Sequence, residues 1–374
     1  MATENSKPTL LGMPLSLVSL ATLAVQNAVL ILVMHYSRIM PPVNGQRYFT
    51  STAVFLNEVL KLIIALAIAF RDTSRNLQGA PFSTVCRTLQ NQAFSSDSWK
   101  LAIPAALYTF QNSLQYIAVS NLDAATFQVT YQLKILTTAI FSVTMLRRKL
   151  AFKQWVALVL LMAGVAIVSV MPSMGGGGDS KKHPKRDGIH ADHGAMSNSI
   201  GLFAVITACA TSGLAGVYFE KVLKNSAKVT LWVRNVQLSF YSLFPALFIG
   251  VIFKDGRAIQ QAGFFAGYNN VVWAAITCQA VGGLLVAMVV NYADNIAKNF
   301  ATSISIILSF IASVWLFDFE ITINFIVGMG FVLYATYLYS APSRPPQTGE
   351  PQSEYKLPNS EDEKESDPAL SQKS

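Results

Sequence analysis

Charged residues are scarce in this chain, and so are cysteine and histidine. Only 13% of its 374 residues are charged, whereas 52% are hydrophobic. That apolar content is too high for an ordinary soluble protein and predicts a polytopic, all-α membrane protein. The three cysteines, Cys86, Cys209 and Cys278, lie far apart in the sequence, so they predict neither a disulfide framework nor a metal cluster. We expect them to pack as small hydrophobic residues.

The residue patterns of enzymes are absent as well. The sequence has four histidines, and only His35 falls within a predicted membrane span. No span holds a pair of carboxylates, and no glycine-rich loop joins a strand to a helix as phosphate-hydrolysing folds require. The other histidines lie near Asp187 and Asp192 in one hydrophilic segment, where no helix would fix the geometry of a metal site. We therefore expect no catalytic residues, no cofactor and no metal.

The net charge of +8 could indicate a nucleic-acid partner, but the basic residues are scattered among short loops and form no continuous basic face. We expect no nucleic acid to bind, because membrane topology explains the charge better. The N-terminus lacks a basic segment followed by a short apolar core and a cleavage site, so it predicts no removable signal peptide. The first hydrophobic span should serve as an uncleaved anchor.

Hydropathy predicts about ten membrane spans, each long enough to cross a bilayer core. Their approximate limits are residues 16–36, 50–70, 101–120, 124–146, 153–171, 200–222, 232–253, 271–291, 296–317 and 321–340. The loops on one side contain thirteen Lys and Arg, and those on the other side contain eight. By the positive-inside rule, both termini should lie in the cytosol.

A weak internal repeat divides the chain into two halves of five spans. A shift of 171 positions aligns Lys134 with Ser305 and the basic turn 147–149 with the acidic turn 318–320. An odd number of spans per half gives the halves opposite orientations, and inverted repeats place a substrate site near the bilayer midplane. The predicted parts are a cytosolic N-terminal segment (1–15), a first five-helix repeat (16–171), a flexible hydrophilic linker (172–199), a second five-helix repeat (200–340) and a disordered cytosolic tail (341–374).

The span at 124–146 carries a lysine near its middle. A charge there costs roughly 2.5–3.5 kcal/mol on insertion scales, so Lys134 should point into a polar cavity or toward an anion. Phe127, Tyr131, Lys134 and Thr138 share one helical face, which offers an aromatic wall, a phenol, a cation and a hydroxyl. This face is expected to line a ligand site. The alternative is a structural lysine paired with a carboxylate on a neighbouring helix.

The second span also contains charged side chains. Asn57 and Lys61 lie one turn apart, with Glu58 on an adjacent face. One interpretation is that Glu58 and Lys61 simply neutralise each other. The other is that Lys61 faces the cavity and Glu58 sets its orientation.

The third span gathers polar side chains on one side, namely Tyr108, Gln111, Asn112 and Gln115. Amides both donate and accept hydrogen bonds, so they suit a nucleobase edge or a hydroxylated sugar. Hydrogen bonding between helices is the alternative.

Glycines in the sixth and eighth spans predict close contacts between helices. Gly213 and Gly216 permit close approach, after which Tyr218 can reach inward, and Ser212 lies beside them. The pair 282–283 in the eighth span predicts a thinned helix wall beside the substrate.

Several long motifs resemble those of Golgi nucleotide-sugar transporters, the family that carries UDP-galactose, UDP-N-acetylglucosamine and CMP-sialic acid. They are ATFQVTYQLKILTTA within residues 121–150, AGVYFEKVLK at 215–224, LWVRNVQL at 231–238, GFFAGY at 263–268 and YADNIAKNFATSISIILS at 292–309. The resemblance implies a ten-helix fold of the drug/metabolite transporter type in the Golgi membrane. It also implies uptake of a UDP-sugar in exchange for UMP. The partners expected from it are Golgi membrane lipid and, as an alternative to a monomer, a second copy of the chain in a homodimer. The first motif looks most like UDP-galactose transporters.

The resemblance also implies roles for individual residues. It favours ligand contact for Asn112 and Lys134, and it makes Lys298, at the start of the ninth span, a second phosphate-binding cation beside a helix N-terminus. Phe127 stands where some relatives have a tyrosine, and Asn291 stands where a lysine is common. The alternatives to a nucleotide-sugar transporter are an exporter of other small metabolites on the same fold and a non-transporting scaffold or receptor.

Overall fold

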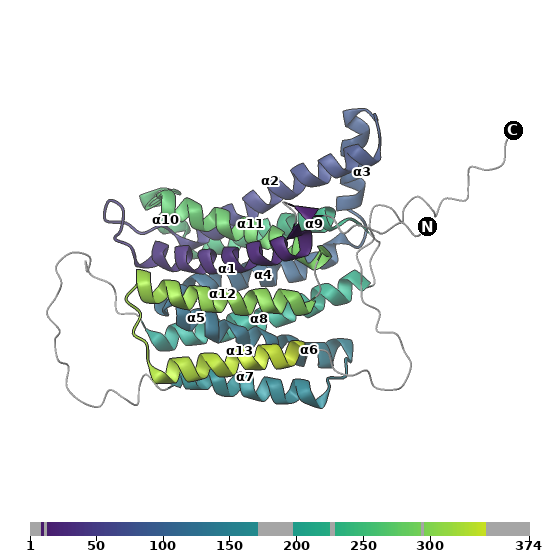
Figure 1. Ribbon diagram of the computed structural model, residues 1–374. Helices are drawn as coiled ribbons and strands as arrows, with labels where there is room; N and C mark the ends of the chain where they lie inside the picture. Colours follow the sequence, from purple (N-terminus) through teal and green to yellow (C-terminus); the bar gives the residue numbers. More distant parts are fainter. Residues whose placement is uncertain (1–8, 11–12, 171–196, 225–228, 293–294, 342–374) are drawn as a thin grey trace.

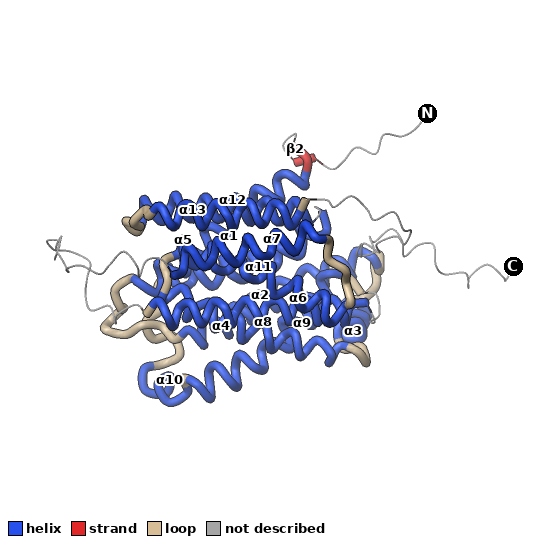
Figure 2. Tube along the Cα trace, turned by 90° about the horizontal axis from the view of Figure 1, so that it is seen from below, coloured by secondary structure: helices blue, strands red, loops and turns tan. Residues whose placement is uncertain are grey.

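A computed structural model describes residues 9–10, 13–170, 197–224, 229–292 and 295–341. In these parts the chain is a bundle of long helices that run roughly alongside one another (Figures 1 and 2), and the paired two-residue strands β1 (Thr9–Leu10) and β2 (Met13–Pro14) are the other regular structure there. The all-α prediction is confirmed. All three cysteines are free, and Cys209 is buried among helices as expected.

Helices occur at every predicted span. They are α1 (Leu15–Ile39), α2 (Thr50–Asn76), α3 (Phe82–Ala93), η1 (Ser98–Leu101), α4 (Ala102–Asn121), α5 (Ala124–Thr130), η2 (Tyr131–Leu133), α6 (Lys134–Leu146), α7 (Phe152–Val170), α8 (Asn198–Lys224), α9 (Leu231–Pro245), η4 (Ala246–Lys254), α10 (Gly256–Ala262), α11 (Asn270–Tyr292), α12 (Asn295–Leu316) and α13 (Ile323–Ser340). Within the described residues, seven helical segments are long and apolar enough to cross a bilayer, so the chain is a multi-pass membrane protein. These are α1, α2, α5 through α6, α7, α8, α9 through η4, and α13.

The helices pack in pairs that follow a regular scheme. The α4–α8, α6–α8 and α4–α9 pairs are in contact, and so are the α1–α11, α1–α12 and α2–α11 pairs. Exchanging α1 with α8, α2 with α9, α4 with α11 and the α5–α6 segment with α12 converts the first set of pairs into the second. The pairs α2–α9, α5–α12 and α7–α13 are also in contact, and each of them maps onto itself when α7 is likewise exchanged with α13.

One end of the bundle is closed by aromatic side chains. The centroid of the Tyr48 ring lies 5.9 Å from that of Tyr268 and 6.4 Å from that of Tyr116. The Arg38 guanidinium lies 5.0 Å from the centroid of the Tyr48 ring. The Tyr268 hydroxyl is 2.8 Å from the hydroxyl of Thr52. Arg38, Tyr48, Thr52 and Tyr268, which we call the aromatic closure, join the ends of α1 and α2 to the segment before α11.

The opposite end carries α3, a short helix in a region that we predicted to be a loop. It lies across the direction of the long helices (Figure 1) and buries Val85 and Leu89 against the bundle. Its last carbonyl groups have no partner within the helix, and the Gln237 amide of α9 donates to two of them, Gln92 O at 3.1 Å and Ala93 O at 3.0 Å. The sequence concealed α3 because its mean hydropathy is low although its apolar residues recur every four positions.

Gly213 sets how closely α8 approaches α6, as predicted from the sequence. A Cβ added there would lie 2.6 Å from Thr137 Oγ1 and 2.7 Å from the Thr138 nitrogen. Gly213→Ala should therefore push the two helices apart and lower the free energy of unfolding by about 1–3 kcal/mol, the usual cost of overpacking.

The measurement is the thermal unfolding midpoint of the purified protein in detergent. The matched control is Gly330→Ala on α13, where an added Cβ meets nothing within 4 Å. Equal midpoints for the two variants would show that the α6–α8 contact tolerates a methyl group.

Candidate functional site

The span that carries Lys134 tightens in its middle. The predicted helix over 124–146 is present, and its residues Tyr131–Leu133 form the 3₁₀ turn η2 between α5 and α6. In a 3₁₀ turn, side chains three residues apart are nearly eclipsed, which brings Lys134 over Tyr131. The Lys134 ammonium lies 4.7 Å from the centroid of the Tyr131 ring, a cation–π contact.

The predicted ligand-lining face becomes more accessible with distance from the aromatic closure. Phe127 is fully buried, Tyr131 is 9% exposed, Lys134 is half-buried and Thr138 is exposed. Phe127 stacks on Tyr131, with ring centroids 5.2 Å apart and planes inclined by 16°. Phe127 was predicted to be a wall of the site; it is buried and packs on the Tyr131 ring, and its contact with a ligand stays a prediction.

The Tyr131 hydroxyl collects hydrogen bonds from two helices. Gln111 and Gln115 of α4 each donate to it at 2.6 Å, and Ser212 of α8 is also hydrogen-bonded to it. The sequence placed these two amides on one side of α4 but left their partner open. The structure shows that they bridge helices, which leaves Asn112 as the amide of that group with a different partner.

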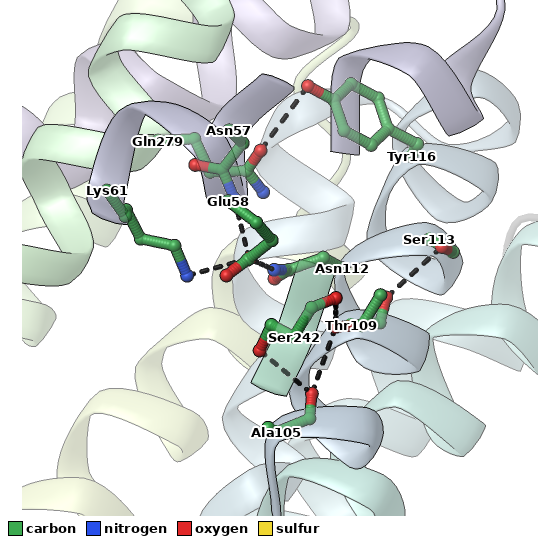
Figure 3. Close-up of polar contacts among 10 residues, drawn as sticks. All are labelled: Asn57, Glu58, Lys61, Ala105, Thr109, Asn112, Ser113, Tyr116, Ser242 and Gln279. Atoms are coloured by element: carbon green, nitrogen blue, oxygen red, sulfur yellow. Dashed lines mark hydrogen bonds and ion pairs between the residues drawn. The ribbon is translucent and has the colours of Figure 1, made fainter. Parts of the chain in front are cut away.

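Asn112 belongs to a cluster around a buried carboxylate (Figure 3). Glu58 is fully buried, and its Oε1 accepts from Lys61 Nζ at 2.7 Å, from Asn57 Nδ2 at 3.0 Å and from Asn112 Nδ2 at 3.3 Å. Its Oε2 is buried and meets no hydrogen-bond donor among the described residues. The predicted ion pair between Glu58 and Lys61 is confirmed.

Lys61 is the accessible member of this cluster. Its side chain is 19% exposed, whereas that of Glu58 is not exposed at all. The lysine stem passes Gly283, where an added Cβ would lie 3.4 Å from Lys61 Cδ. At the neighbouring Gly282, the Gln26 side chain of α1 occupies the space that a Cβ would need. The predicted thinning of α11 therefore accommodates two side chains of the protein.

Other predicted residues flank these groups. Tyr108 lies beside α8, because a Cβ added at Gly216 would be 3.9 Å from its hydroxyl oxygen. Tyr218 is half-buried near the end of α8. Lys298 falls in the first turn of α12, and its side chain lies outside the described residues, as does that of Asn291.

Two polar links between helices were missed from the sequence. Tyr116 Oη donates to Gln279 Oε1 at 3.4 Å, and Gln128 Nε2 donates to Ser309 Oγ at 3.1 Å, which joins α4 to α11 and α5 to α12. Gln279 stands alone in an apolar span and belongs to no spaced pattern. The signal that could have identified it is the cost of burying an unpaired amide among apolar residues.

His35, the predicted intramembrane histidine, has a structural role. Its Nδ1 lies 2.8 Å from the carbonyl oxygen of Val119, which can only accept, so Nδ1 carries the proton. The ring also packs edge-on against Phe317, at 5.1 Å between centroids. It therefore anchors α1 to α4.

The site thus combines a cation over an aromatic ring at a 3₁₀ turn, a second cation held by a buried carboxylate, and amides between them on α4. The sequence profile described as nucleotide-sugar transporter matches residues 12–340. The chain belongs to the nucleotide-sugar transporter family. Members of this family are transporters and not enzymes, in agreement with the absence of a catalytic pattern in the sequence.

Individual relatives of the transporter are similar over most of their length. A UDP-galactose transporter of Schizosaccharomyces pombe is 51% identical over 335 residues, which is 90% of either chain. A UDP-N-acetylglucosamine/UDP-N-acetylgalactosamine transporter of Caenorhabditis elegans is 48% identical over 87% of this chain and 93% of its own. A human UDP-N-acetylglucosamine transporter is 46% identical over 88% of this chain and 97% of its own.

Proposed function

We propose that this transporter carries UDP-galactose or UDP-N-acetylglucosamine from the cytosol into the Golgi lumen in exchange for UMP. The observation that carries the proposal is the position of Lys134, an ammonium beside a 3₁₀ turn within a membrane span, held over Tyr131. An intramembrane cation is costly unless it meets an anion, and the diphosphate of a UDP-sugar supplies one. The names of the relatives supply the two sugars.

The proposed roles follow from accessibility and charge. Lys134 binds the diphosphate above the Tyr131 ring, and Lys298 is the second cation that binds the diphosphate. Lys61 approaches the sugar end, with Glu58 fixing its orientation. Asn112 and Tyr108 contact the nucleoside or sugar from α4. The remaining predicted contacts, Ser212 and Tyr218, lie on α8, where Ser212 also orients Tyr131.

The bundle is proposed to comprise ten spanning helices in two inverted five-helix repeats. The pairing scheme supports this, since exchanging corresponding helices of the two halves maps the contacting pairs onto one another. Transport then proceeds as the halves rock about the shared site. We propose that the aromatic closure lies at the lumenal end and that the site opens toward the cytosolic end, and the increase in exposure from Phe127 to Thr138 supports this.

Both termini are proposed to face the cytosol, because the loops on that side hold the larger share of basic residues. Epitope tags placed at either end should be stained in cells whose plasma membrane alone is permeabilised. A lumenal Golgi protein serves as the control that must stay unstained. A C-terminal tag that is reached only after the Golgi membrane is opened would contradict the even number of spans.

Exchange of a UDP-sugar for UMP should be faster than net uptake of the UDP-sugar. An empty site would leave its cations without phosphate partners during reorientation, which is expensive in a medium of low dielectric constant. Proteoliposomes preloaded with UMP should therefore take up labelled UDP-galactose and UDP-N-acetylglucosamine much faster than vesicles loaded with CMP or buffer. Lys298→Ala should lower the UMP-stimulated rate.

The three internal loads also separate the competing functions. Equal entry rates under all of them would contradict obligatory exchange and favour a facilitative uniporter. An exporter of other metabolites or a scaffold would show no uptake of either UDP-sugar. Thermal stabilisation by UMP, but not by an unrelated amphiphile, would distinguish a nucleotide site from both.

A further inference from the structure

A crevice of about 210 Å³ lies between α12 and α13, on the outside of the bundle. Its walls include Ser303, Ile304 and Ile307 of α12 and Leu333, Thr336 and Tyr337 of α13. It begins near the middle of α12 and reaches the last turn of α13, so it runs toward the membrane surface at which α13 ends.

The crevice faces the bilayer and is separate from the candidate site. Ile304 is 50% exposed and Tyr337 is 52% exposed. The opposite face of α12 is the one that points inward, because Ser309 there is fully buried and accepts a hydrogen bond from Gln128 of α5. A nucleotide bound near Lys134 would therefore be screened from the crevice by α12 itself.

The chemistry of the walls fits a hydrocarbon chain. The Thr336 hydroxyl donates to the Val332 carbonyl oxygen within its own helix at 2.8 Å, so it presents its methyl group rather than a free donor. An apolar cavity of about 150 Å³ already holds a benzene molecule, and this crevice is larger. Tyr337 lies one turn from the end of α13, where tyrosines of membrane helices commonly mark the headgroup level.

We propose that an acyl chain of a phospholipid, from the leaflet at which α13 ends, occupies this crevice. The occupant is a lipid tail rather than a second copy of the chain, because a stable protein interface needs about 800 Å² from each partner and seven lining residues provide far less. Hydrocarbon is also what a bilayer presents to an apolar surface at this depth.

The seated chain supports α12 where its protein contacts are sparse. α12 packs mainly on α1 and also on α5, whereas α13 packs mainly on α7, so the crevice marks a seam between two packed groups. A tail in that seam fills space that would otherwise cost packing energy whenever α12 shifts relative to α13. The lipid tail thus completes the packing between α12 and α13.

The test uses the full chain in phosphatidylcholine vesicles that contain a small fraction of phosphatidylcholine with a photoreactive diazirine in mid-chain. After illumination, labelled residues are mapped by mass spectrometry of peptides. Label should concentrate on 303–307 and 333–340 and exceed that at Ile311, which lies on the same helix, is 58% exposed and is outside the crevice. Even labelling of all exposed positions would overturn the proposal.

Filling the crevice provides the second arm. The double variant Ser303→Phe with Leu333→Phe should lose the label at these positions, whereas Ile311→Phe should keep it. Persistent label in the filled variant, or label from a sterol probe instead of the acyl probe, would overturn the proposal. So would efficient disulfide linkage between two copies that carry Ser303→Cys. If the filled variant does not fold, the label distribution on the unchanged protein decides the question.

Discussion

Replacing Lys134 with glutamine should abolish measurable UDP-sugar uptake while the protein still folds and reaches the Golgi. A hydrogen bond to a charged group contributes about 1.5–3 kcal/mol, and an ammonium facing a diphosphate makes more than one such contact, so a loss of roughly 100-fold or more is expected. Glutamine is only slightly shorter than lysine and stays polar, and the Phe127–Tyr131 stack beneath it does not depend on the charge.

The matched control is Lys149→Gln, which removes the same charge from an exposed position just beyond α6. It should transport normally. Uptake is measured as the initial rate in proteoliposomes that contain equal amounts of folded protein, as judged by size-exclusion chromatography. Normal uptake by Lys134→Gln would end its proposed role in binding, and misfolding of that variant would instead favour a structural lysine.

Replacing Glu58 or Lys61 alone should lower the stability of the protein, and replacing both should restore it. Removing one member of a buried ion pair leaves the other uncompensated and typically costs about 3–5 kcal/mol. Lys61→Gln should therefore lower the thermal midpoint sharply, because it strands a carboxylate that is fully buried. Glu58→Gln should cost less, since the Lys61 side chain is partly exposed and can reach water.

The double variant Glu58→Gln with Lys61→Gln distinguishes the two interpretations of the pair. It leaves no stranded charge, so its thermal midpoint should return close to that of the unchanged protein. If Lys61 binds substrate, uptake should stay low although stability recovers. Recovery of both stability and uptake would mean that Glu58 and Lys61 only neutralise each other.

The sequence alone predicted most of the helices and one buried contact of the site. Long apolar runs need no tertiary information to be recognised, and Glu58 and Lys61 lie three residues apart on one helix, so their contact follows from helix geometry. The 3₁₀ turn at Tyr131–Leu133 could not be predicted. No proline or glycine lies between Ala124 and Leu146, and the turn is held by partners from other helices.

Partners across the bundle explain the other differences. The spacing of Gln111 and Gln115 was readable, but whether they meet a ligand or Tyr131 depends on how α4 packs beside η2. Phe127 lies on the predicted ligand face, and its burial against Tyr131 depends on tertiary packing that the sequence does not show. α3 was missed because a short helix with three buried residues has a weak hydropathy signal.

The amide of Gln237 has a consequence for biosynthesis. It donates to the carbonyl oxygen of Gln92 at the end of α3, and the two residues are 145 positions apart in the chain. At about 5–20 residues per second, a ribosome needs roughly 7–30 s to make that distance. Throughout that interval water must take the place of the Gln237 amide at the end of α3, so α3 reaches its final contacts only after α9 has been inserted. A chain truncated before α9 should therefore be recognised by quality control as unfinished.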